Sequence, residues 1–132
     1  MAAVKHDAEK DRWDLLPYDS VREVVKVLTY GAKKYEDRNW ESGFKYSRIY
    51  GALQRHITAW FQDGEDNDPE TGLSHLAHAG CCILFLLAFK LRGIGKDDRP
   101  KTRKVVFVGG LPSNGAKFVD GVLTVTKSDN NS

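Results

Sequence analysis

The sequence predicts an all-α helical bundle with a short β-hairpin appendage at its C-terminal end. Three segments repeat their apolar residues at steps of three and four, the period of an amphipathic helix, and only the tail changes to β-branched runs. The chain has 132 residues, of which 41% are hydrophobic and 29% charged. This length and composition fit one domain with an appendage and argue against a disordered chain.

Charge and cysteine usage narrow the class of protein further. Twenty Lys and Arg against 18 Asp and Glu give a net charge of +2, which argues against a protein whose main task is to coat nucleic acid. Cys81 and Cys82 are adjacent, so no disulfide framework is expected and a reducing cytoplasm is favoured. The first ten residues are mostly polar, which predicts no signal peptide. The apolar stretch 79–89 is shorter than the roughly 20 residues of a membrane span, so no membrane partner is expected.

The first predicted helix follows a polar arm over residues 5–12 and an apolar plug over 13–17. Ser20 and Glu23 have the S-x-x-E spacing of a capping box, which predicts a helix over residues 21–37. One apolar stripe runs along this helix, formed by Val21, Val24, Val25, Leu28, Ala32 and Tyr35.

Two further helices are predicted after a loop at residues 38–43. The second begins at Tyr46, on a stripe formed by Tyr46, Ile49, Tyr50, Leu53, Ile57, Trp60 and Phe61. The third covers about residues 74–92 and is apolar on nearly all sides, which indicates the central helix of the bundle or an oligomer interface. Gly93 and Gly95 are expected to end it.

The tail changes its period. Residues 96–104 form a basic linker, and the β-branched runs 105–108 and 122–126 are separated by glycine-rich, turn-prone sequence, which predicts a hairpin. We therefore divide the chain into a helical unit over residues 1–100 and a tail over residues 101–132 with linker, hairpin and polar end.

An acidic loop before the third helix is the strongest chemical signal. Residues 63–70 hold five carboxylates, which either lie solvated or bind a divalent cation such as Mg²⁺ or Mn²⁺. His75 and His78 follow on one face of the helix, so they are candidate ligands or neighbours of ligands. Cys82 lies one turn further along that face, which makes a His–His–Cys zinc site a minor alternative to small core residues.

Basic side chains and aromatic rings near the first helix could bind the phosphates and the nucleobase of a nucleotide. Glu36 lies beside Lys34 and Arg38, where a carboxylate can hold a cation and the bases can hold phosphate oxygens; surface ion pairing is the plainer alternative. Trp13 and Trp40 lie in or beside loops, where a ring can stack on a nucleobase or simply plug a helix end.

Several spaced motifs resemble a known family. They are RWDLLP at residues 12–17, YGAKKYEDRNW at 30–40, Arg55-His56, Gly64-Glu65, and DPETGLSHLAHA at 68–79. Together they resemble the phage dATP/dGTP diphosphohydrolases, a branch of the all-α MazG-like nucleotide pyrophosphohydrolases. Within that branch they are most similar to the MazZ-type enzymes of phages that replace adenine by 2-aminoadenine. The resemblance covers roughly residues 5–100 and leaves out the hairpin.

The resemblance implies a metal-dependent homo-oligomer, a dimer or tetramer, in the host cytoplasm. Such an enzyme hydrolyses a purine nucleoside triphosphate, with dGTP expected and GTP or dATP as alternatives, to the monophosphate and pyrophosphate. For the MazZ type, the dGMP product supplies 2-aminoadenine nucleotide synthesis. No obligatory nucleic acid is implied.

The resemblance also implies a site. Glu36, Glu65 and Asp68 would form the catalytic set and hold two or three Mg²⁺ or Mn²⁺ ions, with His75 and His78 as ligands or close to them. The expected phosphate contacts are Lys10, Lys34, Arg38 and Arg55, and the expected nucleobase contacts are Trp13, Asn39 and Trp40.

The carboxylate spacing departs from the wider MazG-like pattern of E-x-x-E and E-x-x-D pairs on facing helices. Asn39, not Glu, stands three residues after Glu36, and Glu65 and Asp68 lie in a loop. A second alignment sets His75 and His78 on the E-x-x-D positions, so two ligand sets stay open. If both histidines ligate, Mn²⁺ is preferred over Mg²⁺.

Two rival functions remain. One is a triphosphohydrolase that releases nucleoside and triphosphate, although the sequence lacks the adjacent His-Asp pair expected for that chemistry. The other is a small, non-enzymatic helical phage protein that binds nucleic acid through the basic residues between 92 and 104.

Overall fold

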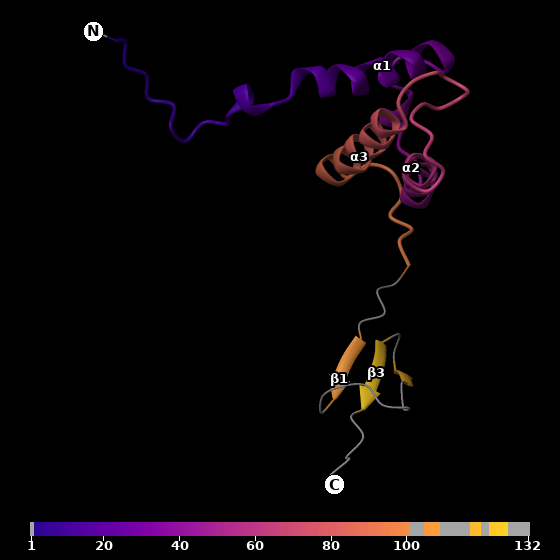
Figure 1. The fold of residues 1–132 in the computed structure, drawn as a ribbon. Coiled ribbons are helices and arrows are strands. Elements are labelled where there is room, and N and C mark those ends of the chain that lie inside the picture. Colours follow the sequence, from indigo (N-terminus) through magenta and orange to yellow (C-terminus); the bar gives the residue numbers. More distant parts are fainter. Residues whose placement is uncertain (1, 101–104, 109–116, 120–121, 127–132) are drawn as a thin grey trace. The chain divides into compact units, whose positions relative to one another are not determined.

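The computed structural model describes residues 2–100, 105–108, 117–119 and 122–126 (Figure 1). The chain forms two compact units, Met1–Lys96 and Asp97–Ser132. The first unit contains the helices α1 (Tyr18–Lys34), α2 (Tyr46–Phe61) and α3 (His75–Arg92), together with the 3₁₀ turns Trp13–Leu15 and Asn39–Ser42. The predicted all-α fold is confirmed.

The ends of α1 differ from those expected. The helix begins at Tyr18, directly after Pro17, and the predicted capping box is wrong: Ser20 lies inside the helix, with its N–H donated to Asp19 Oδ1. A proline loses no hydrogen bond at a helix entry, because the first N–H groups of a helix have no intrahelical partner. The helix ends at Lys34 rather than at residue 37, because the backbone of Tyr35 leaves the helical region.

Both ends of α3 agree with the sequence. The Ser74 hydroxyl oxygen accepts the N–H groups of Leu76 and Ala77, which satisfies two donors at the start of the helix. At the other end Gly93 takes a left-handed φ of 65°, as is common for the glycine that stops a helix. The second helix likewise begins at Tyr46 as predicted.

The core of the first unit is built around α3, which packs against both α1 and α2. Val27 of α1 joins Ala77 and Cys81 in one buried cluster. Phe89 is 0% exposed and lies against the rings of Trp40 and Tyr46, at centroid distances of 6.5 and 6.1 Å. Contacts on two sides explain why α3 carries apolar residues almost all round.

One face of α3 remains exposed in the monomer, formed by Ile83, Leu84, Leu87 and Leu91. By length and composition alone, α3 is also the one helix among the described residues that could cross a membrane. Its buried residues and its two packing partners instead support the predicted role of central helix.

The second unit contains a three-stranded sheet in the order β1-β3-β2. The predicted hairpin between the runs 105–108 and 122–126 is wrong, because the antiparallel pair is formed by β2 (Lys117–Val119) and β3 (Val122–Thr126), with Val119 opposite Val122. The first β-branched run, β1 (Val105–Val108), pairs in parallel with β3 as an additional strand. A three-residue strand is too short for its alternation to be recognised in sequence. The linker at 101–104 and the polar end at 127–132 lie outside the described residues.

The buried ring of Phe89 should dominate the stability of the helical unit. Phe89→Ala should lower the free energy of unfolding by about 3–5 kcal/mol, because it leaves a cavity between α3 and the rings of Trp40 and Tyr46. Tyr50→Ala removes a ring that is 57% exposed and should cost less than about 1 kcal/mol. Urea unfolding measures both values. Equal losses in the two variants would contradict this description of the core.

Candidate metal and nucleotide site

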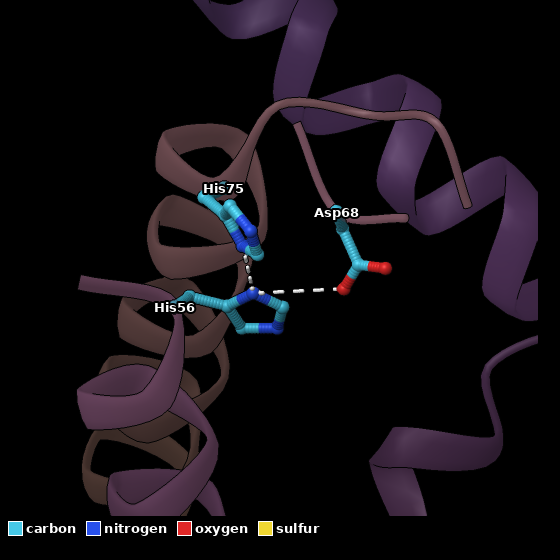
Figure 2. Close-up of side chains that lie close together, drawn as sticks. All are labelled: His56, Asp68 and His75. Carbon is cyan, nitrogen blue, oxygen red and sulfur yellow. Dashed lines mark hydrogen bonds and ion pairs between the residues drawn. The ribbon is translucent and has the colours of Figure 1, made fainter. Parts of the chain in front are cut away.

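Three histidines from α2 and α3 converge on the acidic loop. His56 Nδ1 lies 2.8 Å from His75 Nδ1 and 3.8 Å from Asp68 Oδ2 (Figure 2). The ring of His78 stacks on that of His56, with centroids 4.5 Å apart and planes 6° apart. A cluster of titratable groups therefore joins two helices and the loop that connects them.

The DPETG turn fixes the orientation of the Asp68 carboxylate. Asp68 Oδ1 accepts the backbone N–H groups of Glu70 and Thr71, at 2.7 and 3.3 Å. The turn closes at Gly72, whose φ of 72° favours glycine and whose N–H is donated to the Asp68 carbonyl oxygen. With Oδ1 engaged, Oδ2 is the oxygen that faces His56.

His75 and His78 are anchored separately. His75 is 5% exposed, its backbone N–H is donated to the Asp66 carbonyl oxygen at 2.9 Å, and its Nε2 lies 3.2 Å from Glu65 Oε1. His78 Nε2 lies 2.8 Å from the Thr71 hydroxyl oxygen. Each ring therefore has one nitrogen committed to a neighbour outside the cluster.

Burial sets the charge of these groups at neutral pH. It lowers the pKa of both His56 and His78. His78 and His75 lower the pKa of His56 further, and His75 lowers that of His78. Asp68 opposes these effects in both rings but does not outweigh them, so both rings are neutral. Burial by itself would raise the pKa of Asp68, but the N–H donors of Glu70 and Thr71 and the neighbouring histidines outweigh it and lower the pKa. Neutral imidazole and ionised carboxylate are the forms that bind metal ions.

The geometry of the cluster fits one cation. His56, Asp68 and His75 each offer a ligand atom, and these atoms all lie within 4.8 Å of one another. No cysteine belongs to a comparable group among the described residues. Burial raises the pKa of Cys81 to about 12 and also raises that of Cys82, so both are neutral thiols rather than the thiolates that bind zinc.

A cavity of about 870 Å³ adjoins the cluster and extends along α1. Its wall combines cations, carboxylates and aromatic rings, and His56 and Asp68 lie in it. It brings together seven residues that the sequence singled out: Lys34, Glu36, Arg38, Asn39, Trp40, Asp68 and His78. Charged and aromatic parts of one cavity are suited to an anionic, ring-containing ligand.

Other predicted site residues lie elsewhere. Glu65 contacts His75 rather than the cavity. Lys10, Trp13 and Arg55 are exposed and are absent from the described lining of the cavity. Trp40 stacks on Phe85 at 5.0 Å and lies under the Arg92 guanidinium, so packing already occupies much of its ring.

His56 is the central residue that the sequence reasoning missed as a ligand. In the sequence it stands out only as part of the motif Arg55-His56 of the family resemblance, and it is not one of the residues of the apolar stripe. The available signal was the single histidine of the second helix, and its partner groups lie 12 and 19 residues further along the chain.

Comparison with known proteins identifies the family. A model of the N-terminal domain of dATP/dGTP diphosphohydrolases matches residues 2–99, which include every residue of the cluster and of the cavity. The chain belongs to this family. A protein of Salmonella phage PMBT28 named dATP/dGTP diphosphohydrolase is 34% identical over 99 residues, which are 75% of the chain.

The dATP/dGTP diphosphohydrolase match concerns one part of a longer relative. The chain spans about a third of the length of the Salmonella phage protein. No solved structure matches the chain. The three-stranded sheet lies beyond the region that the family model covers.

The lowered pKa values of His56 and His78 predict how stability depends on pH. The unfolded chain takes up protons at these residues near pH 6.5, before the folded chain does, so the metal-free protein should lose stability as the pH falls below about 6.5. Thermal unfolding with a chelator between pH 7.5 and 5.5 measures this.

His6 in the N-terminal arm provides a matched control. The double variant H56Q/H78Q should reduce the loss of stability between pH 7.5 and 5.5, whereas H6Q should leave it unchanged. The same loss in all three proteins would contradict the assignment of neutral, buried rings.

Proposed function

We propose that the chain hydrolyses a purine nucleoside triphosphate to the monophosphate and pyrophosphate. The observation that carries the proposal is the cavity in which Lys34 and Arg38, the Asp68–histidine cluster and an aromatic wall line one space. The printed name of the Salmonella phage relative, a dATP/dGTP diphosphohydrolase, supports the substrate class. We also propose that the protein is a soluble, cytoplasmic homo-oligomer, either a dimer or a tetramer.

The finer identity of the substrate rests on the sequence resemblance. We propose dGTP as the preferred substrate, with GTP and dATP as alternatives, and dGMP as a product used for 2-aminoadenine nucleotides in a phage of the MazZ type. The carboxylates of Asp37 and Glu41 line the cavity and can accept the N–H groups of a guanine edge, which an adenine edge does not offer in the same positions.

The side chains divide into those that hold a cation and those that hold phosphate. His56, Asp68 and His75 would hold one ion, and Glu36 on the cavity wall is the carboxylate proposed for a further ion, in a set of two or three. When bound, Mg²⁺ or Mn²⁺ acidifies a water and neutralises phosphate charge. Lys34 and Arg38 would bind the phosphate oxygens.

The chemistry requires attack on the α-phosphorus. A water oxygen forms a bond to that phosphorus while the bond to the oxygen that bridges to the β-phosphorus breaks, and pyrophosphate leaves. The water loses a proton, and His78, which is neutral at pH 7, lines the cavity and is not one of the three proposed ligands, can accept it. Arg38 takes a left-handed φ of 57°, uncommon for a non-glycine residue, at the point where its side chain lines the cavity.

Product analysis tests the proposed function. The protein is incubated with each of the eight common ribo- and deoxynucleoside triphosphates and Mn²⁺ or Mg²⁺. Monophosphate and pyrophosphate support the proposal, while triphosphate and nucleoside support the rival triphosphohydrolase. Asp68→Asn should abolish turnover with the fold intact, whereas Asp63→Asn, at an exposed position of the same loop, should retain it. Absence of turnover with every purine substrate would refute the proposal.

The nucleic-acid-binding rival makes a different prediction. It requires salt-sensitive DNA binding through the basic residues between 92 and 104, and this binding would survive Glu65→Gln and Asp68→Asn. Metal-dependent turnover that both changes reduce would favour the enzyme.

The Lys34–Glu70 ion pair should compete with substrate. Lys34 Nζ lies 2.7 Å from Glu70 Oε1, and both side chains line the cavity. Glu70→Gln should lower the KM for a nucleoside triphosphate about two- to fivefold, because it frees Lys34 and removes a negative charge; this corresponds to the strength of one exposed ion pair. Lys34→Gln should raise the KM.

The pair Lys26–Glu23 is a matched control, because it has a similar length of 2.8 Å and similar exposure but does not line this cavity. Glu23→Gln should leave the KM unchanged. A higher KM in Glu70→Gln would show that Glu70 assists binding rather than competing with phosphate.

A further inference from the structure

The donor atoms of the cluster of His56, Asp68 and His75 are mostly imidazole nitrogens. Two of the three donors, on His56 and His75, are imidazole nitrogens, and only Asp68 supplies oxygen. The three side chains lie on α2, on the loop and on α3, so they approach from separate elements (Figure 2). Such a set differs from the carboxylate-only set expected for Mg²⁺.

The donors are already held in place. Ser74 caps the first turn of α3, where His75 is buried, and the turn that contains Asp68 directs Oδ2 toward His56. The two Nδ1 atoms lie 2.8 Å apart. Two ligands of one metal ion with metal–nitrogen bonds of about 2.1 Å lie about 3.0–3.4 Å apart, so the two nitrogens need to separate by only a few tenths of an ångström. Asp68 Oδ2, at 3.8 Å from His56 Nδ1, needs to move closer.

Glu65 sets the tautomer of His75. When His75 Nε2–H is donated to Glu65 Oε1, at 3.2 Å, Nδ1 carries the lone pair and points toward His56 and Asp68. A carboxylate on the far nitrogen of a ligating histidine is the usual arrangement in metal sites, and it increases the basicity of the ligand. Glu65 therefore acts through His75.

We propose that His56, Asp68 and His75 form a site selective for a transition-metal dication of the Mn²⁺, Co²⁺ and Zn²⁺ class over Mg²⁺, with Glu65 as a positioning residue. Imidazole nitrogen is a softer donor than oxygen and favours these ions, whereas Mg²⁺ prefers oxygen ligands and retains its waters. The inference rests on the metal site of the proposed function and specifies the class of ion, and its evidence is the set of described donors rather than the reaction.

Metal binding without nucleotide tests the site. Isothermal titration of the metal-free chain should show one ion of Mn²⁺, Co²⁺ or Zn²⁺ bound at least tenfold more tightly than Mg²⁺, and Co²⁺ should give visible absorption bands of a nitrogen-containing site. His56→Asn should weaken Co²⁺ binding at least tenfold, while His6→Ala in the N-terminal arm should not. Far-UV circular dichroism establishes that each variant is folded.

Two results would overturn the site. One is displacement of Mn²⁺ by an equal concentration of Mg²⁺, and the other is binding to folded His56→Asn with unchanged affinity. Neither result depends on turnover, so failure of this inference and failure of the proposed hydrolysis can be told apart.

Glu65→Gln distinguishes a positioning residue from a ligand. A glutamine oxygen can still accept Nε2–H, so the Co²⁺ bands should keep their wavelengths while the affinity falls roughly 10- to 100-fold. A changed Co²⁺ spectrum at saturation would show that Glu65 ligates directly, and an unchanged affinity would refute its positioning role.

Discussion

The contact between His56 and His75 is the constraint on which the site depends. It brings the middle of α2 to the first residue of α3, with Asp68 of the intervening loop beside it. The two facing Nδ1 atoms form a hydrogen bond when one ring donates and the other accepts. In the proposed metal site, a divalent cation would replace the proton of this hydrogen bond and bind the carboxylate as well, so the same arrangement would serve both folding and ligand binding.

The apolar character of α3 makes this contact possible. Because α3 packs against both α1 and α2, its first turn is fixed relative to each of them, and the loop between α2 and α3 is closed by backbone hydrogen bonds to Asp66 and Asp68. The cavity then lies between α1 and the cluster, with Lys34 from the end of α1 at its wall. The packing of α3 against α1 and α2 thus brings charged groups from α1, α2 and the loop before α3 to the wall of one cavity.

Much of the fold could be predicted from local signals. The bounds of α2 and α3 follow from apolar periodicity, from Ser74 as a cap and from Gly93 as a stop. The start of α1 could not, because Ser20 and Glu23 have the spacing of a capping box while Pro17 begins the helix earlier. The strand Lys117–Val119 is too short for its alternation to be seen, so the parallel pairing of β1 with β3 was not expected.

The site was predictable in part. Asp68, His78 and Lys34 were found because they lie in dense local motifs, and the structure brings them to one cavity. The role of His56 depends on its contact with His75, 19 residues further along the chain, and the spacing of residues along one helix does not reveal such a contact. Glu65 contacts the cluster only through His75.

The most direct measurement for the whole account is a crystal structure with Mn²⁺ and a non-hydrolysable dGTP analogue, in which manganese is located by its anomalous scattering. The account predicts a manganese peak between His56, Asp68 and His75 and a triphosphate that extends along the cavity toward Lys34 and Arg38. Manganese and nucleotide bound elsewhere on the chain, with His56 and His75 still in direct contact, would contradict it.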